Sequence, residues 1–216
     1  MGGMGLRQRL FALTHDRLIA GTEKAGLGDI RSRLLADATG DVLEVGAGTG
    51  RNLAHYPASL TSLTLTEPDP AMLRRLQPAA RAAGVPSKVL RAPAEDLPFD
   101  DATFDTVIST LVLCGVSDQP RAVREIRRVL KTGGRLLVVE HVRADTERLA
   151  CRQDRINWLN RLLVGCECNR PTRDTLQQDG FTVDDVVDGE LPKSPSFVRP
   201  LLLGVARSPI DAPQPA

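Results

Sequence analysis

Aromatic residues are scarce in this chain, which has one Trp, one Tyr and five Phe among its 216 residues. They are scattered along the sequence, so a platform on which nucleic-acid bases stack is not expected. The chain also lacks an excess of charge of either sign. Its 28 Lys and Arg residues nearly balance its 27 Asp and Glu residues, which gives a net charge of +1. Nucleic-acid-binding domains usually carry a basic stripe or face. The composition therefore gives no reason to expect a nucleic-acid partner.

Long apolar runs are absent too, since none approaches the roughly 20 residues that span a bilayer. The first residues, MGGMGLR, lack the apolar core of a signal peptide. We therefore expect no membrane span and a cytoplasmic location. Cysteines in that compartment are reduced rather than bridged, and their spacing lacks the Cys-x-x-Cys pairs of a zinc site. No metal is predicted at the four positions, which are Cys114, Cys151, Cys166 and Cys168.

Residues 42–50, VLEVGAGTG, join an apolar strand to a carboxylate and then to alternating glycines. Such a turn can take positive φ angles and let a ligand approach the backbone. A Walker loop needs a Lys that is missing here, and the dinucleotide fingerprint needs its third glycine one residue later. Glu44 would repel a pyrophosphate but would suit a cation. S-adenosylmethionine carries a sulfonium and an ammonium group, so the motif resembles the first motif of class I methyltransferases that use it.

Further acids follow at the ends of the next predicted strands. Glu67 ends the strand 64–67 and is placed to accept the two hydroxyls of a ribose. In the segment 93–99, PAEDLPF, the family resemblance implies that an acid accepts the adenine amino group. An unrelated doubly wound domain would explain the glycines but not the three acids. The predicted cofactor residues are Glu44, Gly46, Ala47, Gly48, Gly50, Asn52, Glu67, Pro68, Met72, Glu95, Asp96, Leu97, Thr110 and Leu111.

The resemblance to class I methyltransferases implies an α/β fold. We expect a Rossmann-like, doubly wound, seven-stranded sheet in three α/β/α layers, with strand order 3-2-1-4-5-7-6 and strand 7 antiparallel. Consecutive apolar residues such as LLVV at 136–139 fit a sheet covered on both faces. Residues 1–207 are predicted to form one domain with an N-terminal lid helix at about 6–25, and residues 208–216 a disordered tail.

A helix is predicted for about residues 144–163. Leu149, Ile156, Leu159, Leu162 and Leu163 recur at helical spacing and predict a buried face. Trp158 lies in the same helix and is expected in the core. Two strands, 182–191 and 200–207, are expected to follow as a hairpin.

The segments TLVLCGV at 110–116, EIRRVLKTGG at 125–134, EHV at 140–142, GC at 165–166, NR at 169–170 and VRP at 198–200 form a further pattern. Together they resemble the alkyl-thiol S-methyltransferases of the methyltransferase-like-7 type and their bacterial relatives, over roughly residues 41–207. The menaquinone and ubiquinone methyltransferases are a looser match. The vertebrate thiol enzymes begin with an apolar membrane anchor, whereas this chain begins with a polar segment around RQR at 7–9.

Few residues are candidates for direct catalysis, because methyl transfer needs alignment more than activation. His141 follows a strand at the edge where open sheets bind ligands, although such a residue is often only a hydrogen-bonded loop residue. Asn169 and Arg170 could hold an anionic nucleophile or form a helix-capping turn. His15 belongs to the predicted lid helix. Cys114 and Cys166 are expected to be packing residues.

The sequence therefore predicts a methyltransferase that uses S-adenosylmethionine, yields S-adenosylhomocysteine and acts on a small molecule. A thiol is the preferred acceptor. The alternatives are a quinone-like or phenolic ring methylated on carbon or oxygen, a cofactor-binding protein without catalysis, and hydride transfer with a nicotinamide cofactor, which the glycine spacing disfavours. We expect a monomer, with a dimer as the alternative.

Overall fold

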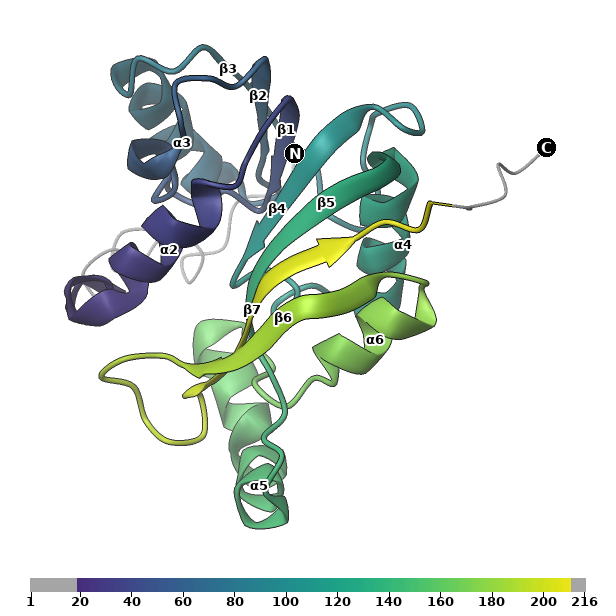
Figure 1. Cartoon of the computed structure of the whole chain (residues 1–216). Coiled ribbons are helices and arrows are strands. Elements are labelled where there is room, and N and C mark those ends of the chain that lie inside the picture. The colour runs from purple at the N-terminus through teal and green to yellow at the C-terminus, as the bar shows by residue number, and fades with distance from the viewer. Residues whose placement is uncertain (1–18, 211–216) are drawn as a thin grey trace, which may run out of the picture.

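A computed structural model of the chain describes residues 19–210, and Figure 1 shows their arrangement. The described part of the predicted N-terminal helix contains the π-helix η1 (Glu23–Leu27), which is kinked at Gly26, where φ is 141°. The other helices are α2 (Gly28–Leu35), η2 (Leu53–His55), α3 (Pro70–Ala82), α4 (Gln119–Val129), α5 (Glu147–Val164) and α6 (Thr172–Gln178). The strands are β1 (Asp41–Val45), β2 (Ser62–Thr66), β3 (Ser87–Leu90), β4 (Phe104–Thr110), β5 (Leu130–His141), β6 (Thr182–Glu190) and β7 (Pro200–Arg207).

The strands form one seven-stranded sheet in the order β3-β2-β1-β4-β5-β7-β6. Strands β1 to β5 pair in parallel, and β7 runs antiparallel to both β5 and β6. This confirms the predicted order and the predicted hairpin. The two halves of the sheet diverge at β1 and β4, so a crevice opens where these strands end.

Apolar side chains cover both faces of the sheet, as its consecutive apolar residues predicted. In β5, Leu136 and Val138 belong to the cluster that includes the buried side chains of α4 and α6. Leu137 and Val139 point the other way and belong to the cluster that includes those of α2 and α3. The alternation follows from the two-residue period of a strand. The predicted three-layer α/β/α architecture is therefore confirmed.

Helix α5 departs from the prediction. Its only buried residues are Ala150, Gln153 and Asn160. Leu149 and Ile156 are half-buried, whereas Leu159, Leu162 and Leu163 are exposed, so the expected burial was wrong for the second half of the face. Trp158 is 66% exposed, so its expected place in the core was wrong as well. The helical spacing identified the helix, but it could not show that α5 projects beyond the strands, as Figure 1 shows.

Polar contacts, rather than an apolar seam, attach α5 to the rest of the domain. The side-chain amide of Gln153 donates to the carbonyl oxygens of Val142 and Cys168. Within residues 19–210, no helix has the length and apolar character that a membrane crossing requires.

Candidate cofactor and active site

A cavity of about 410 Å³ opens at the carboxyl ends of β1, β2 and β4. Most of the predicted cofactor residues line it: Glu44, Gly46, Ala47, Gly48, Asn52, Glu67, Pro68, Met72, Glu95, Thr110 and Leu111. Gly50, Asp96 and Leu97 do not. Residues from the two halves of the sheet therefore meet at one place, as the topology requires.

The β1 loop comes very close to the β4 loop. A Cβ built on Gly46, where φ is 60°, would lie 2.7 Å from a methyl group of Val112. No larger residue fits there without moving the β4 loop, and the backbone angle also favours glycine. Gly50, although outside the cavity, is restricted in a similar way, because its Cβ would lie 2.5 Å from Leu53. These glycines keep the loop backbone at the cavity wall.

Glu44 lies in the cavity wall within a hydrogen-bonded network. The Asn52 amide donates to one carboxylate oxygen at 2.9 Å, and the Tyr56 hydroxyl donates to the other at 2.5 Å. Arg31 in turn donates to the Asn52 side-chain oxygen at 2.7 Å. Burial raises the pKa of Glu44 to about 6, while the hydrogen bond from Tyr56 lowers it. At neutral pH the group is mostly ionised and provides the negative charge that an ammonium group needs.

Arg31 is a cavity residue that the sequence did not single out. It comes from α2, is 5% exposed and forms an ion pair with Glu23 at 3.0 Å. Its guanidinium is placed beside Glu44 and Asn52, so the cavity offers both signs of charge at one end. A zwitterionic amino acid group fits such a pair. Nothing in the sequence distinguished Arg31 from the many other arginines.

Glu67 follows β2 and is held by backbone donors. Gly48 N–H donates to one carboxylate oxygen and Asp69 N–H to the other, both at 2.8 Å. Burial raises the pKa of Glu67, opposed by these two hydrogen bonds. Each oxygen keeps a free lone-pair direction, so the carboxylate can still accept the two hydroxyls of a ribose. Asp69 also caps α3 by accepting from Ala71 N at 2.6 Å.

The segment predicted to face adenine meets the cavity through Pro93, Ala94 and Glu95. The Glu95 carboxylate accepts from Ser117 N at 2.7 Å. Asp96 is exposed and lies outside the cavity. If adenine binds at this end, the nearer groups are Glu95 and the backbone of residues 93–95, and the adenine role of Asp96 stays a prediction that the cavity does not support.

The buried carboxylate of Glu140 accepts hydrogen bonds from the β4 loop. The sequence did not single out this residue. Glu140, at 0% exposure, accepts from Ser109 Oγ at 2.7 Å, Val112 N at 2.9 Å and Cys114 N at 3.1 Å. The loop includes Leu111, which has a positive φ of 58°. An acid within an apolar strand was a visible signal, because such a group must find donors when buried.

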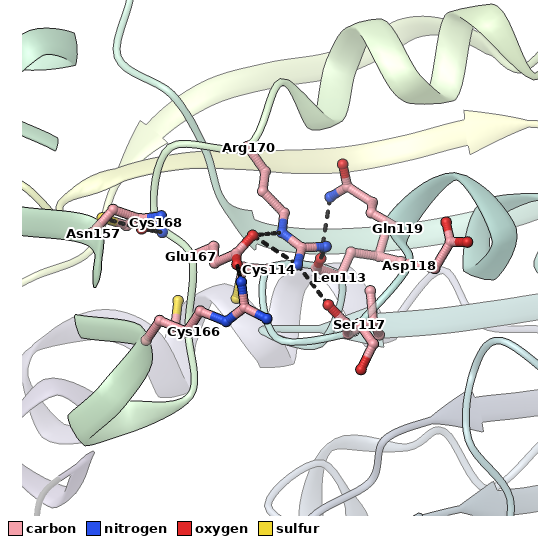
Figure 2. Close-up of polar contacts among 12 residues, drawn as sticks. Leu113, Cys114, Ser117, Asp118, Gln119, Asn157, Cys166, Glu167, Cys168 and Arg170 are labelled. Atoms are coloured by element: carbon pink, nitrogen blue, oxygen red, sulfur yellow. Dashed lines mark hydrogen bonds and ion pairs between the residues drawn. The ribbon is translucent and has the colours of Figure 1, made fainter. Parts of the chain in front are cut away.

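Arg170 donates hydrogen bonds to backbone carbonyl groups of the same β4 loop, as Figure 2 shows. Its guanidinium donates to Val116 O at 2.5 Å and Leu113 O at 3.2 Å, and also to the Glu167 carboxylate at 2.8 Å. All three guanidinium nitrogens of Arg170 thus donate to the protein, although we expected them to hold an anionic nucleophile. Arg170 lies outside the cavity, so its position fits a brace of the β4 loop better than a substrate contact.

Asn169 and His141, two further catalytic candidates, do not line the cavity. Asn169 donates to Asp154 on α5 at 2.8 Å. His141 is buried, its Nδ1 has no hydrogen-bond partner in the described structure, and burial lowers its pKa to about 4. His15 lies outside the described residues. The catalytic roles of these three residues therefore remain predictions.

The cysteines are free thiols, and residues 19–210 contain no cluster of three or more metal-ligating side chains. A hydrogen bond with the Cys166 thiol and burial raise the pKa of Cys114 well above its usual range. A protonated, buried thiol is a poor nucleophile. This agrees with the expectation that Cys114 is a packing residue.

The residues present fit the predicted cofactor. Paired charges at Arg31 and Glu44 suit an amino acid group, Glu67 suits ribose hydroxyls, and Met72 and Leu111 supply apolar wall. Such a mixture of apolar lining with a few placed polar groups is typical of ligand pockets.

Comparison with known proteins gives a consistent result. A family model described as a methyltransferase domain matches residues 43–138. Human thiol S-methyltransferase TMT1A is 32% identical over 170 residues, which cover 76% of this chain and 69% of TMT1A. The ubiquinone/menaquinone biosynthesis C-methyltransferase UbiE of Idiomarina loihiensis is 36% identical over 104 residues, which cover 46% of this chain and 41% of UbiE.

Among solved structures, a SAM-dependent methyltransferase from Thermotoga maritima, described as a possible histamine N-methyltransferase, superimposes with a TM-score of 0.69. The match covers 95% of this chain and 100% of that one at 21% identity. At this identity the likeness concerns the fold alone.

Replacing Glu67 by Ala is expected to weaken S-adenosylmethionine binding by about 1–3 kcal/mol, the cost of removing a partner from buried hydroxyl groups. Isothermal titration calorimetry measures this directly. Asp184→Ala, which removes an exposed acid from β6, should leave the affinity unchanged. Equal affinities for all three proteins would contradict the assignment of Glu67 to the ribose.

Cofactor affinity is expected to fall as the pH decreases through about 6, the raised pKa of Glu44. The ionised carboxylate attracts the ammonium group above this pH, and protonation removes the attraction below it. The loss should reach about tenfold one pH unit below the pKa. Glu44→Gln should bind more weakly at neutral pH and show a flatter profile. A mutant profile as steep as that of the wild type would assign the pH dependence to another group, such as Glu67.

Arg170→Ala is expected to lower kcat/KM for the acceptor by about tenfold, equivalent to about 1.4 kcal/mol, because the β4 loop loses its carbonyl brace. Hydrogen exchange in residues 112–117 should rise in parallel. Arg170→Lys should not restore activity, because one ammonium cannot reproduce the planar fork of a guanidinium. Gln178→Ala, which removes an exposed side chain from α6, is the control and should behave as wild type. The brace would be disproved if Gln178→Ala were equally harmful.

Proposed function

Because this chain belongs to the family of S-adenosylmethionine-dependent methyltransferases, we propose that it transfers the methyl group to the sulfur of a small thiol. Among the relatives compared, the thiol S-methyltransferase TMT1A matches the larger part of this chain, 76% against 46% for UbiE. The likeness supports the branch, but a fold and a family alone do not fix the acceptor.

The lining of the cavity carries the proposal. Its described residues include no His, Lys or Cys. Its four acids are Glu44, Glu67, Asp69 and Glu95, and each accepts hydrogen bonds from the protein. Glu44 and Glu67 are assigned to the cofactor, and Asp69 caps α3. A carbon nucleophile needs a positioned base, most often His. A thiol with a pKa near 8.5 supplies enough thiolate by itself.

The chain's own residues would bind and orient rather than exchange protons. Glu44 and Arg31 would hold the amino acid group of the cofactor and Glu67 its ribose, and the braced β4 loop forms part of the cavity wall. The cofactor supplies an electrophilic methyl and a neutral leaving group. Alignment of this kind can be worth about 7–11 kcal/mol.

Methylation of a quinone-like ring on carbon is the second candidate, supported by the 36% identity to UbiE. It would need a positioned base, most often His, and His15 of the predicted lid helix is a candidate. Binding without catalysis is a further alternative. A cytoplasmic location and a monomeric state belong to this proposal as well, and rest on the sequence.

Purified protein should form S-adenosylhomocysteine with small thiols and not with phenols or quinols, as measured by mass spectrometry. With a thiol acceptor, kcat/KM should rise with pH and level off near the acceptor's own pKa, and the inflection should move when a more acidic thiol is used. Glu67→Ala is the control with weakened cofactor binding, and should turn over more slowly at a subsaturating cofactor concentration. Turnover of quinols alone, abolished by His15→Ala, would replace the proposal with the second candidate. Cofactor binding without turnover of any acceptor class would favour a binding protein.

A further inference from the structure

The second half of α5 exposes large apolar side chains to solvent. Trp158 is 66% exposed, Leu162 52% and Leu163 64%, and Leu159 and Val164 accompany them. Scattered exposed apolar residues are ordinary, but a contiguous group marks an interaction site. In the described part of the chain, nothing buries this group.

The four residues from Trp158 to Leu163 lie on one face of the helix. Positions 158, 159, 162 and 163 are spaced by one, four and five residues, which places them together. Arg148, Arg152 and Arg155 fall on the same face in the preceding turns, and all three are exposed. The face is therefore basic in its first half and apolar in its second. We call it the α5 face.

The two acids of α5 lie to the side of this face. Glu147 is exposed in the first turn, and the Asp154 carboxylate is paired with Arg143 at 2.7 Å. Arg148, Arg152 and Arg155 therefore leave the face with a basic excess. Arg161 also flanks the apolar residues, and pairs with Glu167 at 2.6 Å. Arg, Trp and Leu are the residue types that helices at a membrane surface expose.

The α5 face ends beside the cavity. A Cβ added to Gly115, which lines the cavity, would lie 3.3 Å from the carbonyl oxygen of Gly165, the residue that follows α5. Glu167 N–H donates to Cys114 O at 2.7 Å. Figure 2 shows how closely the segment after α5 runs along the β4 loop. A surface that binds the apolar half of α5 would therefore lie next to the cavity wall.

We propose that the α5 face docks on the surface of an anionic lipid bilayer. The apolar half would enter the headgroup region, and the arginines would contact anionic headgroups. A second copy of the chain is a poorer fit, because it would bring three exposed arginines of the same face, Arg148, Arg152 and Arg155, against like charge. The docking itself is independent of the acceptor. Its consequence, access of a membrane-dissolved apolar thiol to the cavity, rests on the proposed function.

Vesicle co-sedimentation tests the docking without any methyl transfer. The full chain is mixed with vesicles of phosphatidylcholine alone or of an equimolar mixture with phosphatidylglycerol. We expect clear binding to the anionic vesicles, much weaker binding to the neutral ones, and a decrease with rising salt. Trp158→Ser and Leu162→Ser should each reduce the partition coefficient by about tenfold, since each removes an apolar side chain from the contact.

Matched controls separate docking from general surface properties. Val187→Ser replaces a side chain on β6 that is 55% exposed, and should bind as wild type. Arg155→Glu should weaken binding to anionic vesicles, whereas Arg124→Glu, an exposed residue of α4, should not. All variants should keep the wild-type cofactor affinity, which confirms that they fold.

Three outcomes would overturn the inference. One is no binding of wild type to anionic vesicles, and another is binding that the α5 variants and the controls change equally. The third is a concentration-dependent dimer that Trp158→Ser abolishes in the absence of lipid binding, because the occupant would then be a second copy. Failure of the thiol panel would leave the vesicle result unaffected, so the two proposals fail separately.

Discussion

The contact between the β1 loop and the β4 loop is the constraint on which the rest of the site depends. Gly46 leaves no room for a side chain against Val112, so the position of one loop fixes that of the other. The β4 loop is held on both sides, by Glu140 at its N–H groups and by Arg170 at its carbonyl groups. Two charged residues of opposite sign, from β5 and from the segment after α5, thus determine the shape of a cavity that neither of them lines.

Three buried acids take different roles because their partners differ. Glu140 accepts hydrogen bonds from three donors on the β4 strand and loop and serves the structure. Within residues 19–210, Glu67 accepts two backbone hydrogen bonds, one at each oxygen, and keeps capacity for a ligand. Glu44 sits in a side-chain network and retains enough charge at neutral pH to attract a cation. Burial raises the pKa of all three, so each needs its donors to stay ionised.

Helix α5 serves the domain in an unusual way for an internal helix. It contributes few buried side chains, and polar contacts such as those of Gln153 hold it in place. Its exposed face is thereby free for another surface, while its C-terminal end stays attached to the β4 loop. The proposed docking surface on α5 and the residues that contact the β4 loop are therefore close together in the sequence.

The sequence by itself determined the strands and the glycine-rich loop and singled out Glu44 and Glu67 as candidate cofactor acids. These follow from local patterns: apolar periods that match a strand or helix, and residue types at fixed offsets from a strand end. The strand order followed from the family resemblance. Tertiary structure alone decided the roles of Arg31, Tyr56 and Glu140, whose partners lie far along the chain. It also placed Asp96 outside the cavity, turned Arg170 toward backbone carbonyls and left Trp158 in solvent. Helical spacing shows that side chains share a face, but only packing in three dimensions decides what that face meets.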